Sequence, residues 1–172
     1  MSDADSLWAS LATRVVRVAL ARWDHGYAEL VETLVSAGIQ ENERSLINRV
    51  SRGTARFTLL LQIIHVARDE PPPLWIDALS TVGSWEARAH GVMVAELSRQ
   101  PWVTPLKLAQ RLADIGVPIG EKTLALHLEE GTFSLSLFLQ CLTVLGSPSL
   151  DRYIPFNQLV SAANAGRAAA SV

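Results

Sequence analysis

The feature that most constrains the fold of this chain is an internal repeat at an offset of 78 residues. Residues 30–66 align with residues 108–144 without a gap, and 11 of 37 positions are identical. Most of the identical residues are leucines and glycines, and their spacing follows one face of a helix. The identical pairs include Leu34/Leu112, Gly38/Gly116, Glu43/Glu121, Leu46/Leu124, Gly53/Gly131 and Gln62/Gln140. We interpret the repeat as a duplication, which predicts two copies of one folding unit.

Each unit is predicted to contain four helices. In the first unit, apolar residues three and four positions apart predict helices at 6–24, 27–37, 42–52 and 57–68. The equivalent segments of the second unit are 76–98, 105–115, 121–130 and 134–145. Gly38 and Gly116 follow the second helix of each unit and suit a left-handed turn. Because 49% of the residues are hydrophobic, the chain has ample material for a buried core. The predicted fold class is therefore all-α.

Composition divides the chain into four parts. The predicted boundaries are a first unit at 1–70, a linker at 71–76, a second unit at 77–150 and a C-terminal tail at 151–172. The sequence DEPPPL at the linker cannot continue a helix and favours a stiff, extended connection. We expect the long opening helices of the two units to pack on one another as a pseudo-twofold pair. The tail is predicted to hold a short helix at 156–163 and to fray at AGRAAASV.

Several functional classes find no support in the sequence. A single cysteine, Cys141, cannot form an internal disulfide and is predicted to be a core residue. The four histidines lie far apart, so no metal site is expected. Phosphate-binding glycine loops and nucleophile motifs are missing, and we predict neither catalysis nor a small-molecule cofactor. No apolar run approaches the ~20 residues of a membrane span, and the acidic N-terminus lacks a signal core. A cytoplasmic protein is expected.

The segment ENERSLINRVSRGTARF at 41–57 combines a core face with a polar face. Leu46, Ile47 and Val50 gather on one side of the expected helix. The opposite side carries Arg44, Ser45, Asn48 and Arg52. Whole-chain net charge is −2, yet residues 14–68 contain eight arginines against five acids, whereas residues 77–150 contain five basic residues against seven acids. The pattern is typical of a helix that presents hydrogen-bond donors to a partner.

The order of helices and the motifs YAELVETL and INRVSRG make the first unit resemble lambda-repressor and Cro-like (XRE-type) helix-turn-helix proteins. The chain also resembles a small bacterial domain family of unknown function, whose members carry a YAEL-type helix, an NRVSRG-like segment and an apolar FLLQ-type helix. Two copies cover roughly 7–68 and 85–145. Together the two resemblances imply two tandem four-helix units of helix-turn-helix type, of which the second has diverged.

The first resemblance implies a sequence-specific, DNA-binding transcription regulator. In that class the third helix enters the major groove of double-stranded DNA. The implied contacts to base edges come from Arg44, Ser45 and Asn48. The implied contacts to the phosphate backbone come from Arg49, Arg52 and Arg56, with Tyr27 as an additional one. The arginines of the first helix, Arg14, Arg17 and Arg22, are interpreted as solvated. The protein would act in the cytoplasm, associated with the nucleoid, as a homodimer that reads two half-sites.

The second unit departs from the pattern on its outward face. Asn48, Arg49, Ser51 and Arg52 correspond to Leu126, His127, Glu129 and Glu130. The two glutamates would repel phosphate, so this copy is predicted to support assembly or to bind a protein partner. The competing hypothesis is a protein-interaction module, such as a subunit or antagonist of another transcription factor, that binds DNA only with a partner. A heterodimeric DNA binder lies between the two hypotheses, and a purely solvated arginine face is the plainest alternative.

Overall fold

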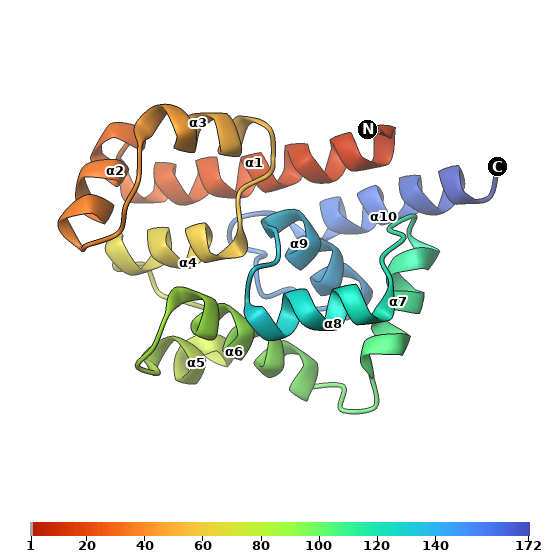
Figure 1. The fold of residues 1–172 in the computed structure, drawn as a ribbon. Helices are drawn as coiled ribbons and strands as arrows, with labels where there is room; N and C mark the ends of the chain where they lie inside the picture. The colour runs from red at the N-terminus through yellow and green to blue at the C-terminus, as the bar shows by residue number, and fades with distance from the viewer. Residues whose placement is uncertain (1) are drawn as a thin grey trace.

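The computed structural model describes residues 2–172, and all regular elements in that range are helical (Figure 1). The first unit contains α1 (Asp3–Trp23), α2 (Tyr27–Ser36), α3 (Glu43–Ser51) and α4 (Phe57–Val66). The linker contains the 3-10 helix η1 (Pro73–Trp75), and the second unit follows with α5 (Ile76–Ser80), α6 (Trp85–Ser98), α7 (Pro105–Asp114), α8 (Glu121–Glu130) and α9 (Leu135–Val144). The last helix is α10 (Phe156–Ala170). The predicted all-α fold is confirmed. No helix in the described range is long and apolar enough to cross a membrane.

The predicted single helix at 76–98 is wrong, because the chain breaks between α5 and α6. Gly83 lies at the break with a φ of 157°. Ser84 then caps the new helix, since its hydroxyl accepts a hydrogen bond from the backbone N–H of Ala87 at 3.1 Å. The linker also differs from the extended connection that was expected. Pro73 starts a short 3-10 helix that leads directly into α5, and it places Trp75 fully inside the core.

The frayed C-terminus was also predicted wrongly, since α10 runs to Ala170 and packs on α1 and α9. Its buried residues are Leu159, Ala162, Ala163 and Gly166. This narrow stripe of small residues lets α10 approach its neighbours closely. At Gly166 a Cβ atom would lie 2.0 Å from the carbonyl oxygen of Ile115, so only glycine fits there. The length of this helix was underestimated because its second half is mostly alanine, which produces little contrast between an apolar and a polar face.

The two units are related by a pseudo-twofold axis between α4 and α9. The backbone N–H of Phe57 donates to the carbonyl oxygen of Phe133 at 3.1 Å, and that of Leu135 donates to Ala55 at 2.9 Å. Phe57 corresponds to Leu135 in the repeat, and Ala55 corresponds to Phe133, so the two hydrogen bonds are equivalent. α1 packs on α9, and reciprocally α6 packs on α4. The expected pairing of the opening helices with each other is therefore wrong, because the fourth helices occupy the centre.

Aromatic side chains fill the space at this axis. The ring of Phe57 stacks on Phe138 with centroids 3.8 Å apart and on Phe133 at 5.5 Å, and its edge meets Trp75 at 5.6 Å. All four rings are buried. Because they come from α4, the α8–α9 connection, α9 and the linker, one cluster belongs to both units. Cys141 of α9 is also fully buried, as predicted, and burial raises the pKa of its thiol to about 12.

An ion-pair cluster around Asp69 joins the end of the first unit to the segment before α10. Arg22 of α1 donates to the Asp69 carboxylate at 2.9 and 3.1 Å, so the interpretation of Arg22 as merely solvated is wrong. The hydroxyl of Tyr153 donates to the same carboxylate at 2.7 Å, and Arg152 lies 3.6 Å away. The hydrogen bond from Arg22, chiefly, and that from Tyr153 lower the pKa of Asp69 to about 2.

Asp69→Asn is expected to remove a pH-dependent part of the stability. Because the folded pKa lies below the unfolded value near 3.9, the contribution of Asp69 is complete above about pH 4 and is lost as pH falls toward 2. We expect Asp69→Asn to cost roughly 1–2 kcal/mol at pH 7, after allowance for solvent screening, with the difference from wild type shrinking below pH 4. Urea unfolding at pH 7, 4 and 2.5 measures it. Asp114→Asn, which removes an exposed carboxylate without an ion pair in residues 2–172, is the control. A cost for Asp69→Asn that stays constant down to pH 2.5 would contradict the assignment.

Candidate nucleic-acid interface

The segment 41–57 folds around α3 largely as its sequence predicts. The side chain of Asn42 caps the helix by accepting a hydrogen bond from the backbone N–H of Ser45 at 3.1 Å. Leu46 and Val50 are buried, and Gly53 adopts the left-handed conformation with a φ of 68°. The buried hydroxyl of Thr13 on α1 donates to the carbonyl oxygen of Val50 at 2.6 Å. α3 is therefore fixed to α1 at its C-terminal end.

The outward face of α3 carries the polar residues expected there. The exposed residues are Arg44, Ser45, Asn48 and Arg52, which line a shallow cavity of 390 Å³ together with Asn42, Arg49 and Thr54. Arg44, Asn48 and Arg52 are four residues apart, so they follow one line along the helix. Neither Arg44 nor Arg52 forms an ion pair within residues 2–172. Their charges are available to an external partner.

Arg49 is placed differently from its neighbours. Its guanidinium forms an ion pair with Glu41 at 2.6 Å, and the side chain is 40% exposed. The Nε atom is buried without a hydrogen-bond partner in the described structure. Since Glu41 itself is largely buried, the pair attaches α3 to the turn that precedes it. Much of the charge of Arg49 is balanced inside the protein.

Two other predicted contacts lie outside the α3 cavity. Arg56 is exposed at the start of α4, where its backbone forms an antiparallel bridge with Ser134 beside the pseudo-twofold axis. Tyr27 is the first residue of α2 and is partly buried against the hydrophobic core. The structure thus brings Arg44, Ser45, Asn48, Arg49 and Arg52 together and leaves the remaining two apart from them.

Two arginines of α1 that we interpreted as solvated, Arg14 and Arg17, also lie at this surface. Arg14 and Arg17 are exposed and line a groove of 620 Å³ with Arg52, and the groove also contains the hydroxyl residues Ser6, Ser10, Thr13, Ser51 and Thr54. Arg52 and Thr54 line both this groove and the α3 cavity, so the two form one surface. Arg14 also donates to the side chain of Gln158 on α10. The three-residue spacing of Arg14 and Arg17 was visible in the sequence, but only the packing of α1 on α3 brings them to this surface.

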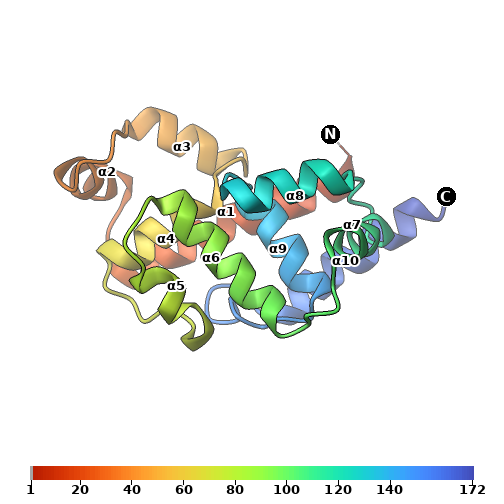
Figure 2. The same ribbon diagram turned by 60° about the horizontal axis from the view of Figure 1, so that its bottom comes forward.

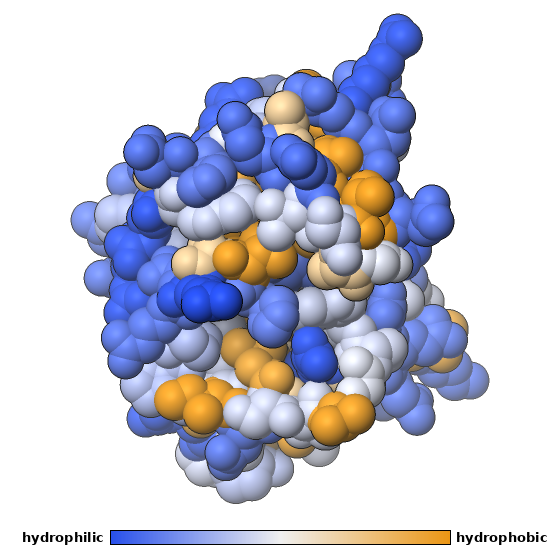
Figure 3. Space-filling model, turned by 90° about the vertical axis from the view of Figure 1, so that its left-hand side faces the viewer, coloured by the Kyte–Doolittle hydropathy of each residue, from blue (hydrophilic) through white to orange (hydrophobic). Residues whose placement is uncertain are grey.

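The surface around α2 and α3 is predominantly hydrophilic. Seen from the end of the molecule that carries these helices, it is broken by separate apolar patches (Figure 3). Among the apolar side chains of α2, Val35 is 52% exposed. No group of three or more His, Cys, Asp or Glu side chains among residues 2–172 is arranged to hold a metal ion. The side chains that line the α3 cavity are arginines, asparagines, a serine and a threonine, while α2 and the first turn of α3 also expose carboxylates at Glu29, Glu32 and Glu43.

Comparison with known proteins assigns both units to one family. A family model described as "Domain of unknown function (DUF6471)" matches residues 8–70 and again residues 85–150. The chain belongs to the DUF6471 family. The two matches coincide with the two copies of the internal repeat, which confirms the tandem arrangement. Searches of the curated proteins and of the solved structures gave no significant match.

The second DUF6471 unit keeps the helix that corresponds to α3 and changes its outward face. In Figure 2, α3 and α8 lie along the upper side of the molecule, above α4 and α9. α8 buries Leu124 and Leu128 at the positions of Leu46 and Val50. Its outward residues differ: Leu126 is 51% exposed, and Glu129 and Glu130 are exposed. The DUF6471 fold is therefore shared by both units, but of the line Arg44, Asn48 and Arg52 the second unit keeps a cation only at the first position, as Lys122.

Proposed function

We propose that the protein is a sequence-specific DNA-binding transcription regulator whose first unit reads the major groove through α3. The observation that carries this proposal is the line of Arg44, Asn48 and Arg52 along one exposed face, with both arginines free of ion pairs within residues 2–172. α2 packs on α3 and is joined to it by residues 37–42, and in the proposed mode α3 takes the place of the recognition helix in the major groove. An α-helix with its side chains is about 10–12 Å across, so α3 fits a major groove about 12 Å wide.

The side chains divide into base-reading and phosphate-binding groups. Arginine pairs in a bidentate manner with guanine, and asparagine with adenine, which assigns Arg44 and Asn48 to base edges, with Ser45 beside them. Arg52 belongs with Arg14 and Arg17, because all three line the hydroxyl-rich groove beside α3. Donors of this kind position a protein on the phosphate backbone. Arg49 contributes less, since Glu41 already neutralises it, and Arg56 and Tyr27 remain peripheral phosphate contacts.

One cationic third helix per chain favours binding as a homodimer. A single recognition helix contacts few base pairs, and a second copy of the chain would supply a second half-site. The second unit of the same chain is not expected to read the second half-site, because α8 presents Glu129 and Glu130 where α3 presents Ser51 and Arg52. The second unit would instead contribute to assembly. We place the protein in the cytoplasm with the nucleoid.

A protein-interaction module remains the second candidate function. The observation that favours it is Leu126, which is half exposed on α8 beside two exposed glutamates. An exposed leucine beside carboxylates that would repel phosphate suits a partner protein better than DNA. In this alternative the chain is a subunit or antagonist of another transcription factor and reaches DNA only with that partner.

The experiment that tests DNA binding starts with selection of sites from a random duplex library by the purified full chain, followed by fluorescence polarisation. Arg44→Ala is expected to weaken binding of the selected site by about 1–3 kcal/mol and to relax preference at one base pair. Arg52→Ala should weaken all duplexes similarly and make the salt dependence shallower by about one phosphate contact. Arg167→Ala, on the exposed end of α10, is the charge-matched control.

The result also separates the two candidate functions. Failure to enrich any site, together with wild-type affinity of both α3 variants for mixed duplex, would exclude the α3 surface as the reader. Recovery of a specific site only in the presence of a host extract would favour the partner-dependent alternative.

A further inference from the structure

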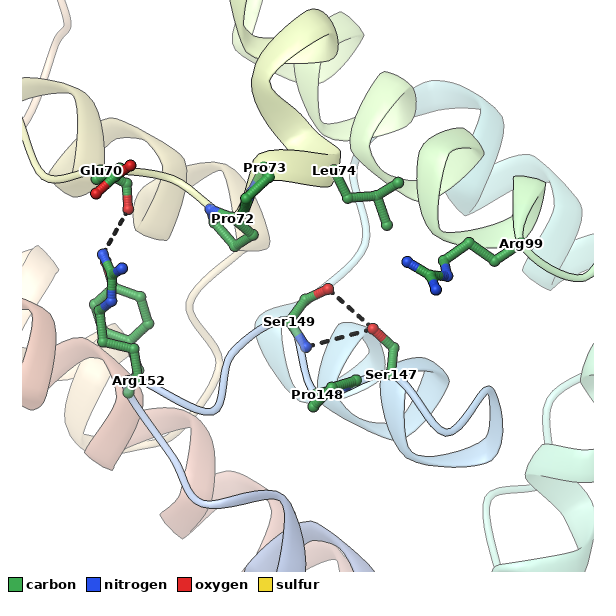
Figure 4. A pocket seen from close by; sticks show the side chains of 10 residues that line it. Glu70, Pro72, Pro73, Leu74, Arg99, Ser147, Pro148, Ser149 and Arg152 are labelled. Atoms are coloured by element: carbon green, nitrogen blue, oxygen red, sulfur yellow. Dashed lines mark hydrogen bonds between the residues drawn. The ribbon is translucent and has the colours of Figure 1, made fainter.

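A cavity of 440 Å³ lies where the linker between the units meets the segment that follows α9 (Figure 4). Its lining comes from residues 70–74, residues 147–153 and Arg99 just beyond the end of α6. The volume falls within the range of small-molecule sites, about 300–1,000 Å³. None of the lining residues belongs to the α3 cavity or to the groove beside it. The cavity therefore needs a separate explanation.

The walls of this cavity are apolar and rigid. They are formed by Pro72, Pro73, Leu74 and Pro148. Proline has no backbone N–H and a fixed ring, so the three prolines offer flat apolar surface without hydrogen-bond donors. Figure 4 shows the two prolines of the linker on one side and Pro148 with the serines on the other. A flat apolar body fits between such walls.

The two arginines that line the cavity are in different electrostatic states. Arg152 donates to the carbonyl oxygen of Glu70 at 2.8 Å and lies 3.6 Å from the Asp69 carboxylate. The Glu70 side chain adds another negative charge at that end. Arg99 lies at the opposite end in Figure 4, is exposed and forms no ion pair within residues 2–172. The charges at the Glu70 end therefore balance one another, and an anion would be attracted to Arg99, which is unpaired in that range.

A buried carboxylate fixes the direction of the serine hydroxyls. Glu96 is only 2% exposed, and it accepts hydrogen bonds from Trp75 Nε1 and from Ser147 Oγ, each at 2.7 Å. The single hydroxyl proton of Ser147 is thereby used. Ser149 Oγ lies 2.9 Å from Ser147 Oγ and must be the donor in that pair. The oxygen of Ser149, which lines the cavity, is left as a hydrogen-bond acceptor.

We propose that this cavity binds a small hydroxylated aromatic monocarboxylate. The carboxylate pairs with Arg99, the hydroxyl donates to Ser149, and the ring packs against Pro72, Pro73 and Pro148. Because only one of the lining arginines lacks an ion pair in the described structure, a monoanion matches the site better than a phosphate dianion. The site goes beyond the proposed DNA binding and does not depend on it.

Isothermal titration of the full chain with 4-hydroxybenzoate tests the proposal, with benzoate, phenol and inorganic phosphate as comparison probes. We expect saturable binding of one 4-hydroxybenzoate per chain, with weaker binding of the other three. Arg99→Ala should lose at least about tenfold in affinity, the effect of a lost charge-assisted hydrogen bond. Ser149→Ala should weaken 4-hydroxybenzoate by about threefold to tenfold while leaving benzoate unchanged. Arg167→Ala, a surface arginine outside the cavity, should match wild type.

Three results would overturn the site. They are no saturable binding of 4-hydroxybenzoate at millimolar concentration, equal affinity for phenol, or unchanged affinity in Arg99→Ala with an unchanged thermal midpoint. Tighter binding of phosphate than of 4-hydroxybenzoate would reject the ligand class. The comparison of probes uses the wild-type chain, so it stands even where a variant unfolds. Failure here leaves the α3 surface untouched, since the two share no residue.

Discussion

Phe57→Ala is expected to lower the free energy of unfolding by about 3–5 kcal/mol, the usual cost of deleting a large buried aromatic side chain. This residue of the first unit is fully buried and contacts aromatic rings of the second unit and of the linker. Its removal leaves a cavity at the pseudo-twofold axis, which the surrounding rings can fill only partly. Since a domain is stable by only about 5–15 kcal/mol, this one change removes a large fraction of the total.

Urea unfolding followed by far-UV circular dichroism and by tryptophan fluorescence measures this loss. Because the cluster is shared, both signals should shift together and describe one transition. Phe156→Ala, at the partly exposed start of α10, is the control and should cost much less. Two separated transitions in wild type, with Phe57→Ala moving only one, would show that the units unfold independently and would contradict the shared core.

Gly131→Ala is expected to be the next most destabilising change, at about 2–5 kcal/mol in total. A Cβ atom at this position would lie 1.9 Å from the carbonyl oxygen of Glu86, so α6 and α8 would have to separate. Overpacking of this kind costs about 1–3 kcal/mol. The residue also has a φ of 68°, and the left-handed conformation costs a residue with a Cβ about 1–2 kcal/mol more.

Gly146→Ala separates these two contributions. Gly146 has nearly the same φ, 67°, but no atom lies within 4 Å of its Cβ position. It should show only the conformational cost, about 1–2 kcal/mol. Chemical denaturation of both variants in parallel gives the difference. Equal losses would mean that the close approach of α6 to α8 is not required for stability.

The sequence predicted those parts of the fold that depend on local spacing. Seven of the eight helices expected in the two units formed close to their predicted bounds, because leucines at helical spacing and glycines after helix ends act within a few residues. The break at Gly83 and Ser84 was missed. A serine can lie inside a helix or cap the start of a new one, and the residues around Ser84 do not decide between the two. The arrangement of helices was also missed. Nothing local indicates that α4 pairs with α9, because that choice depends on the fit of Phe57 against rings 76 and 81 residues further along the chain.

The candidate site was predictable to the same extent. One helical face placed Arg44, Ser45, Asn48 and Arg52 together, and the structure confirms that they are exposed on it. Arg49 differed because its partner, Glu41, belongs to the preceding turn, whose path no periodicity specifies. Arg14 and Arg17 reach the same surface only through tertiary packing of α1 on α3. The cavity at Arg99 is formed by three segments that are far apart in the sequence, so no continuous sequence motif could indicate it.

Two backbone hydrogen bonds cross the pseudo-twofold axis, from Phe57 to Phe133 and from Leu135 to Ala55. This reciprocal pattern is that of a twofold dimer interface, but here both halves belong to one polypeptide. Between separate chains, such an interface forms only above a threshold concentration. Joined by the short linker, the halves meet at a fixed effective concentration, so their association survives any dilution in the cell. The outward residues of one half can then differ from those of the other without loss of the interface, as they do between α3 and α8.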